Sequence, residues 1–123
     1  MAKGSLDRAV VVTGASTGIG RAGVAKAVRE GAHAFASVRK QGDADSLTGE
    51  FGDAVTPLLF DLANEAAVRA GAAKVEAALG KQRLMGLVNN AGIAVAGPLL
   101  HLDTEELRRQ FEINLYGVTL CTP

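Results

Sequence analysis

The sequence contains no tryptophan, and aromatic residues make up only 4% of it. Its single cysteine, Cys121, has no partner in the chain for a disulfide, so nothing indicates an oxidising compartment. The charges balance, with 13 basic and 13 acidic residues, which gives no electrostatic argument for binding nucleic acid or an anionic membrane surface. A core made from these residues must rely on small aliphatic side chains.

Long apolar runs are missing too. No run reaches the roughly 18 residues of a membrane-spanning helix, and residues 1–8 lack the apolar stretch of a secretory signal. The two histidines, His33 and His101, stand alone without metal-ligand spacing, so we predict no metal site. We therefore expect a cytoplasmic protein, and its 123 residues, 48% of them hydrophobic, suffice for one domain.

Short apolar segments alternate with helical patterns along the chain. Strands buried on both faces are predicted at 9–12, 34–38, 55–60 and 84–88. Helices are predicted over 18–30, after an N-cap at Asn64, and from a capping box formed by Asp103 and Glu106. The polar segment 41–52 predicts a loop with one short helix around 46–51. This alternation predicts an α/β fold with a parallel sheet and helices on both faces.

A glycine-rich loop follows the first predicted strand. It reads Thr13-Gly14-Ala15-Ser16-Thr17-Gly18-Ile19-Gly20. Three glycines at this place allow a tight turn, the approach of a pyrophosphate, and close packing of the next helix, whose N-terminus offers N–H groups and a positive dipole end. No lysine follows Gly20, which excludes a Walker A loop. A turn without a ligand is the alternative, but the position between strand and helix favours dinucleotide binding.

The end of the second predicted strand indicates which dinucleotide would bind. The segment Ser37-Val38-Arg39-Lys40 contains no carboxylate, which NAD(H)-binding folds use to hold the adenosine ribose. Arg39 can instead bind a 2′-phosphate through two N–H groups, and Lys40 adds positive charge. We therefore predict NADP(H) in preference to NAD(H), with a solvated basic pair as the alternative.

Together these segments resemble the short-chain dehydrogenase/reductase family. The glycine loop, Asp61-Leu62, Asn89-Asn90-Ala91-Gly92 and Ile113-Asn114-Leu115 match that family in order and spacing, over essentially the whole chain. The resemblance implies an NAD(P)-dependent oxidoreductase with a Rossmann-type, doubly wound parallel sheet. About four strands of that sheet, in the order 3-2-1-4, are expected in this chain.

The resemblance also implies roles for individual residues. Asp61 would contact the adenine ring, with Leu62 beside it, and Asn114 would be the catalytic asparagine that holds a water in a proton relay. Thr17 stands where some NADP-using members have a basic residue, so the NADP(H) expectation depends mainly on Arg39. The predicted cofactor-binding residues are Gly14, Ser16, Thr17, Gly18, Ile19, Gly20, Arg39, Asp61, Leu62, Asn89, Asn90, Ala91 and Gly92.

Asn114 also has an interpretation that is independent of the family. Helical spacing places it on one face with Leu107, Phe111 and Val118, which are apolar. We therefore expect a buried amide, which needs hydrogen-bond partners. A structural amide bonded to backbone is the alternative to the catalytic role.

The serine, tyrosine and lysine that the family uses for hydride transfer have no counterparts here. Tyr116 is the only tyrosine, Leu120 stands four residues later where a lysine would lower its pKa, and no serine follows Ser46. We expect Tyr116 to be a packing residue. We expect residues 1–123 to form a single domain truncated before the catalytic segment, inactive alone, with an apolar sheet edge that promotes self-association.

Three functional hypotheses follow. In the first, the complete protein is a homo-oligomeric reductase of a small carbonyl or alcohol substrate, with no nucleic-acid or membrane partner. In the second, the chain is a non-catalytic remnant that binds a dinucleotide or a partner. In the third, it is a nucleotide-independent α/β domain, such as a flavodoxin-like module.

Overall fold

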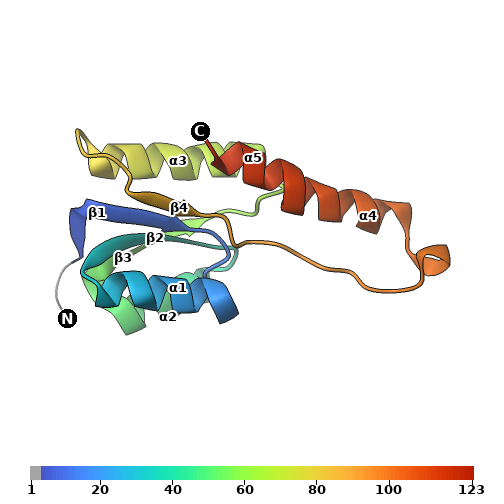
Figure 1. The fold of residues 1–123 in the computed structure, drawn as a ribbon, viewed down its shortest axis with the longest axis horizontal. Helices are drawn as coiled ribbons and strands as arrows, with labels where there is room; N and C mark the ends of the chain where they lie inside the picture. The colour runs from blue at the N-terminus through green and yellow to red at the C-terminus, as the bar shows by residue number, and fades with distance from the viewer. Residues whose placement is uncertain (1–3) are drawn as a thin grey trace.

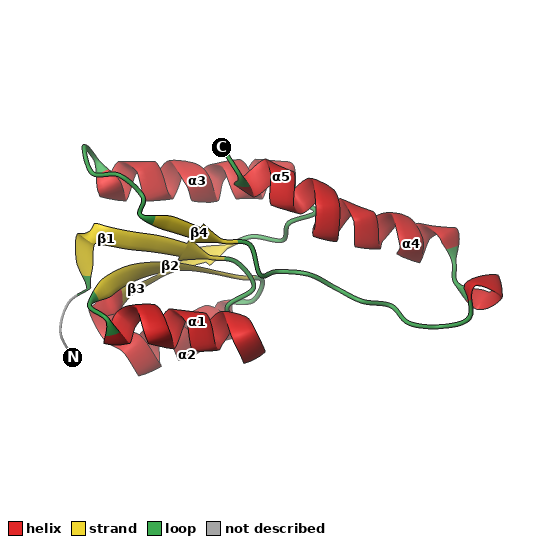
Figure 2. Ribbon diagram, viewed as in Figure 1, coloured by secondary structure: helices red, strands yellow, loops and turns green. Residues whose placement is uncertain are grey.

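A computed structural model describes residues 4–123 and shows a four-stranded parallel sheet between two layers of helices (Figures 1 and 2). The sequence showed no secretory signal in residues 1–8, and the first three of these lie outside the described residues. The strands are β1 (Ser5–Val12), β2 (Ala32–Val38), β3 (Val55–Leu59) and β4 (Gly86–Val88). They lie in the order β3-β2-β1-β4, as predicted. All pairs are parallel, so the carboxyl ends of the strands meet at one edge of the sheet.

The two helices on one face are α1 (Gly18–Arg29) and α2 (Gln41–Phe51). They cover a core that includes Val12, Val24 and Leu47, each with at most 1% of its surface exposed. Strand β2 is buried along its whole length, because it lies inside the sheet and both of its faces are covered. This explains its continuous apolar sequence without alternation.

The other face is covered by α3 (Glu65–Leu79) and by the end of the C-terminal helical run (residues 104–121), whose Ile113, Leu120 and Cys121 pack in the same core. The side chain of Asn64 caps α3 by accepting a hydrogen bond from the Ala67 N–H at 3.1 Å, as the sequence predicted. Val68, Val75 and Leu79 of α3 pack against Phe60 and their neighbours. The doubly wound arrangement is therefore confirmed.

The segment 41–52 corrects the expectation of a loop with a short helix. Helix α2 begins at Gln41 and is followed by a 3₁₀ turn over Gly52–Ala54. Its three apolar residues, Ala44, Leu47 and Phe51, are buried against the sheet. Three glycines and two aspartates make this segment resemble a loop, but tertiary packing of one apolar face overrides the low helical propensity of those within α2.

After β4 the chain makes a long excursion away from the sheet, seen at the right of Figure 1, with one 3₁₀ turn at Leu99–His101. It returns through α4 (Thr104–Phe111), a π-helical turn (Glu112–Tyr116) and α5 (Gly117–Cys121), which ends beside α3. Asp103 caps α4 by accepting from the N–H of Glu105, one residue earlier than the predicted capping box requires.

The C-terminal helical run also corrects the predicted apolar face. Ile113 and Gly117 are buried, whereas Phe111 and Tyr116 are 56% and 58% exposed. The wider π turn changes which positions face inward, so a uniform α-helical spacing selected the wrong residues. The expectations of a buried Asn114 and of a packed Tyr116 are therefore wrong.

Candidate functional site

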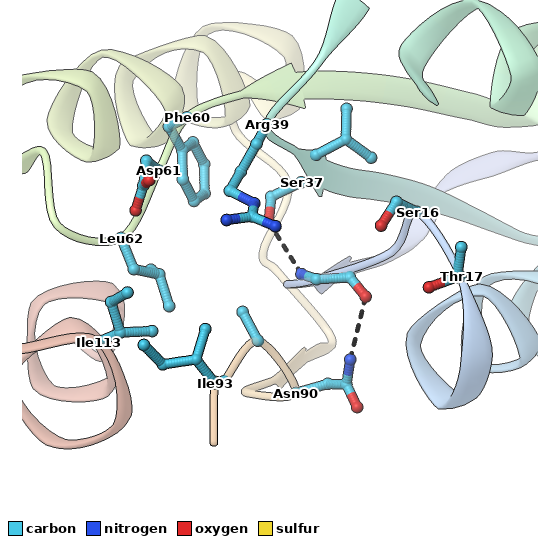
Figure 3. A pocket seen from close by; sticks show the side chains of 14 residues that line it. Ser16, Thr17, Ser37, Arg39, Phe60, Asp61, Leu62, Asn90, Ile93 and Ile113 are labelled. Atoms are coloured by element: carbon cyan, nitrogen blue, oxygen red, sulfur yellow. Dashed lines mark hydrogen bonds between the residues drawn. The ribbon is translucent and has the colours of Figure 1, made fainter. Parts of the chain in front are cut away.

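A cleft of about 300 Å³ lies at the carboxyl ends of the strands, where β1, β2 and β4 each lead into a loop (Figure 3). This edge is where open parallel sheets place their ligands. The glycine loop, the end of β2, the segment after β3 and the segment after β4 all contribute to its walls. The fourteen lining residues are Gly14, Ser16, Thr17, Ser37, Val38, Arg39, Phe60, Asp61, Leu62, Asn90, Ala91, Gly92, Ile93 and Ile113.

The glycine loop combines one open position with one crowded position. Gly18 has a φ of +60°, and a Cβ placed on it would meet nothing within 4 Å. At Gly20, by contrast, a Cβ would lie 2.1 Å from the carbonyl oxygen of Gly14. Gly18 thus supplies a conformation that other residues rarely adopt, on a surface that a ligand can approach, while Gly20 lets α1 begin against the loop. The predicted role of one glycine in close packing of the helix agrees with Gly20, and the approach of a pyrophosphate to another stays a prediction.

The loop is fixed by β2 on one side and by the segment after β4 on the other. The Oγ of Ser37, on β2, accepts a hydrogen bond from the Gly14 N–H at 3.1 Å. On the other side, the Nδ2 of Asn90 donates to the carbonyl oxygens of Thr13 and Gly14, at 3.1 Å each. The bonds from Ser37 and Asn90 to Gly14 are the dashed lines in Figure 3.

Thr13 completes this frame. Its Oγ1 accepts hydrogen bonds from the N–H groups of Asn90 and Ala91, each at 3.0 Å, and its side chain is 1% exposed. The segment after β4 is therefore tied to the end of β1 through main-chain and side-chain atoms. The sequence identified Asn90 and Ala91, but it did not identify Thr13 or Ser37 as part of the site. Their positions at the ends of adjacent parallel strands were the available signal.

Arg39 and Asp61 lie at the mouth of the cleft. The Arg39 side chain is exposed and extends over the cleft near Ser37 and Phe60 in Figure 3. Among residues 4–123 no acidic side chain forms an ion pair with it. The Oδ1 of Asp61 accepts from the Ala63 N–H at 3.0 Å, which holds the turn after β3. Leu62 is buried beneath it.

Four of the predicted cofactor-binding residues lie outside the cleft wall. They are Gly18, Ile19 and Gly20, at the start of α1, and Asn89, whose Nδ2 donates to the Oγ1 of Thr122 at 3.2 Å. Ile19 is 83% exposed. Val38, Phe60, Ile93 and Ile113 line the cleft without having been predicted, because their apolar side chains resemble ordinary core residues in the sequence.

Asn114 binds the main chain of the loop after β4. Its Oδ1 accepts from the Ile93 N–H at 2.8 Å, and its Nδ2 donates to the Ile93 carbonyl oxygen at 2.7 Å. Asn114 is exposed and lies in the π turn, while its neighbour Ile113 lines the cleft. The pairing with backbone agrees with the structural interpretation of this amide, and its catalytic role stays a prediction.

Comparison with known proteins identifies the relationship that this geometry suggests. The family model of the short chain dehydrogenases matches residues 8–123. The chain belongs to the short-chain dehydrogenase/reductase family. Its match to that family excludes the flavodoxin-like alternative as a description of the fold.

The individual relatives support the same assignment. The chain is 39% identical over 115 residues to an NADPH-dependent 3-dehydrocapnine reductase of Ornithobacterium rhinotracheale, covering 94% of this chain and 41% of that protein. It is also similar to a blue fluorescent protein from a metagenomic library, solved with NADPH (TM-score 0.83, 30% identity, 93% of this chain and 48% of the other). A third similar protein is the 3-ketoacyl-(acyl-carrier-protein) reductase of Brucella melitensis, solved with NADH (TM-score 0.83, 33% identity, 94% and 47%).

The chain spans about two fifths of the length of the curated relatives that it matches. Among residues 4–123, no helix is both long enough and apolar enough to cross a membrane. In the same residues, no three histidine, cysteine, aspartate or glutamate side chains are grouped as ligands of a metal ion.

Proposed function

We propose that this chain is the dinucleotide-binding part of an NADP(H)-preferring reductase of the short-chain family. The complete protein would act on a carbonyl or alcohol group of a small molecule. The observation that carries the proposal is the pairing, in one cleft, of an open glycine loop with Arg39 at the end of β2, where NAD(H)-binding folds have an acid.

The residues present fit such a cofactor. The N-terminus of α1 offers N–H groups that have no acceptor within the helix, beside an approachable Gly18, which suits a pyrophosphate. Arg39 would hold a 2′-phosphate, and Asp61 and Leu62, which line the same cleft, would lie beside the adenine ring. When bound, the cofactor would supply or accept a hydride.

The residues of this chain that would act on a substrate are few. Asn114 and Ile93 form one paired unit at the end of the cleft, and the family's acid–base tyrosine has no counterpart in this sequence. Tyr116 is 58% exposed and is followed four residues later by Leu120. We therefore propose that the chain binds NADP(H) without turning over substrate.

Fluorescence titration of the chain with NADPH and NADH tests the proposal. We expect NADPH to bind more tightly, and Arg39→Ala to weaken NADPH roughly 10- to 100-fold with little effect on NADH, because one charge-assisted contact is lost. Lys40→Ala is the matched control, since it removes the same charge from the next residue, which does not line the cleft. Equal affinities of the wild type for both cofactors would refute the NADP(H) preference, and equal losses of NADPH affinity in both variants would refute the assignment of that preference to Arg39.

The non-catalytic remnant is the second candidate, because the lack of a Tyr-x-x-x-Lys pair in this sequence is compatible with it and with the first candidate alike. Reading the coding DNA beyond the Pro123 codon in all three frames separates the two. Codons for serine and Tyr-x-x-x-Lys would support a complete reductase, whereas a stop codon without them would support the remnant. A cytoplasmic location and homo-oligomeric assembly stay predictions from the sequence.

A further inference from the structure

Arg21 connects three segments around the candidate site without lining the cleft itself. It lies in the first turn of α1, directly after the glycine loop. Its Nη1 donates to the carbonyl oxygen of Ser16 at 3.1 Å. Its Nη2 donates to the Oγ of Ser46 at 3.0 Å, and its Nε donates to the Oε2 of Glu50 at 3.0 Å. Nη2 also forms an ion pair with Glu50.

The bond to Ser16 fixes one peptide group of the glycine loop. In a trans peptide the C=O and N–H groups point in opposite directions. Because the Ser16 carbonyl points to Arg21, the N–H of Thr17 points away from Arg21. Ser16 and Thr17 both line the cleft, so Arg21 sets the direction of a main-chain donor in the part of the loop that would bind phosphate.

The bonds to Ser46 and Glu50 fix α2 relative to the same loop. The guanidinium also lies over the ring of Phe51, with its Cζ 6.0 Å from the centroid. Helix α2 begins directly after Arg39 and Lys40, and the Lys40 carbonyl accepts from the N–H groups of its first turn. The Arg39 backbone therefore lies between β2 and α2, and α2 helps to fix its position.

We propose that Arg21 is a positioning residue that couples the phosphate-binding loop to α2, so that the pyrophosphate and 2′-phosphate sites keep one relative geometry. This inference deepens the proposed function and rests on it. Arg21 would act through Ser16 and through α2. The Arg21 side chain is 25% exposed and its guanidinium is already paired with Glu50, so the group is engaged by the protein before any ligand binds.

A positioning role and a purely attractive role predict opposite results at Glu50. If Arg21 attracted phosphate simply as a charge, Glu50→Ala would unmask that charge and tighten NADPH binding. If Arg21 positions the loop and α2, the same variant loosens both and weakens binding, by roughly 3- to 10-fold for a lost charge-assisted contact. Arg21→Lys keeps the charge but cannot make the forked contacts, so it should weaken binding to a similar extent.

The experiment measures NADPH and NADH affinity together with amide hydrogen exchange of the ligand-free chain. Arg21→Lys and Glu50→Ala should both accelerate exchange in residues 14–20 and in 41–51, and both should weaken NADPH more than NADH. Glu30→Ala is the matched control, because it removes the same charge from an exposed ion pair with Lys26 on α1. It should change neither measurement.

If Glu50→Ala lowers the melting temperature, Ser46→Ala is a milder variant, because it removes only one hydrogen-bond partner of Arg21. Tighter NADPH binding by Glu50→Ala, unaltered binding by Arg21→Lys, or faster exchange confined to α1 would each overturn the inference. If the wild-type chain binds no dinucleotide, the proposed function fails. The exchange of residues 14–20 and 41–51 still decides whether Arg21 couples the loop to α2.

Discussion

Gly20 is the residue whose replacement should damage the site most directly. An added Cβ would lie 2.1 Å from the Gly14 carbonyl oxygen and 2.6 Å from the Asn90 Nδ2, so the start of α1 would have to move. We expect Gly20→Ala to lower the free energy of unfolding by about 1–3 kcal/mol, measured by urea denaturation.

Gly49, in α2, is the matched control for that change. A Cβ there meets nothing within 4 Å, so Gly49→Ala should raise the free energy of unfolding by about 0.5–1 kcal/mol through helix propensity. Equal stabilities of the Gly20→Ala variant and the wild type would contradict the close approach of α1 to the glycine loop.

Cys121 should react slowly with alkylating reagents at neutral pH. Burial raises the pKa of its thiol above the ordinary value of 9.0, so less thiolate is present in the folded chain than in the unfolded one. We expect iodoacetamide to modify the folded chain more slowly than the urea-unfolded chain at pH 7.5, with the difference narrowing as the pH rises through the folded pKa. Because the pKa of the Cys121 thiol is higher in the folded chain than in the unfolded one, its contribution to the free energy of unfolding is present below pH 9.0. That contribution is lost as the pH rises through the folded pKa. Equal alkylation rates at pH 7.5 would contradict the burial.

At the scale of elements, Asn114 joins the π turn to the loop that follows β4. Asn114→Ala removes two hydrogen bonds to Ile93, at 2.8 and 2.7 Å. We expect the Ile93 amide to exchange roughly 10-fold faster, which corresponds to the net free energy of about one such bond. Asn89→Ala serves as the control, since the Asn89 side chain bonds to Thr122 instead and its loss should leave Ile93 exchange unchanged. Equal effects of the two variants would show that Asn114 does not hold this loop.

The sequence predicted the elements whose signals are local. The cap at Asn64, the glycine loop and the buried strand β2 follow from residue types and spacing. Helix α2 was predicted only in part, around 46–51, because its three buried apolar residues are separated by glycine and aspartate, and only the sheet beneath it makes helix the favourable state over its whole length. The π turn was not predicted, because no scale of residue propensity distinguishes it from the α-helix around it.

The residues of the cleft divide in the same way, into those that the sequence predicted and those that only the folded structure reveals. Gly14 and Arg39 were predicted from residue type and from their position after a strand, whereas Asp61 and Asn90 were predicted from the family resemblance; all four line the cleft. Ser37 was not found, because its role depends on β2 lying beside the glycine loop in register, which becomes visible only when the strands are paired.

At the scale of the whole molecule, the described sheet has one edge at β4, beside exposed apolar side chains. Leu84, Met85 and Val88 are 37%, 56% and 47% exposed. The predicted apolar edge is therefore present in the part of the chain that the structure describes. Unpaired edges of this kind favour pairing between chains.

We expect the chain to self-associate at micromolar concentration, and Met85→Lys to shift it toward the monomer in sedimentation velocity. Leu59→Lys is the control, because Leu59 is 49% exposed on β3, the opposite edge of the sheet. A wild-type monomer at these concentrations, or equal effects of the two lysines, would refute association through β4.

The frame around Thr13 has a consequence for the time course of folding. Strand β1 pairs with β2, which follows soon after it, but the bonds from Asn90 and Ala91 to the Thr13 hydroxyl span 77 and 78 positions. Contacts between residues so distant in sequence form late, because loop closure must come first. During synthesis the Thr13 hydroxyl cannot form these hydrogen bonds until Ala91 has left the ribosome. The carboxyl edge of the sheet, where the cleft lies, is therefore completed after β1 and β2 have paired.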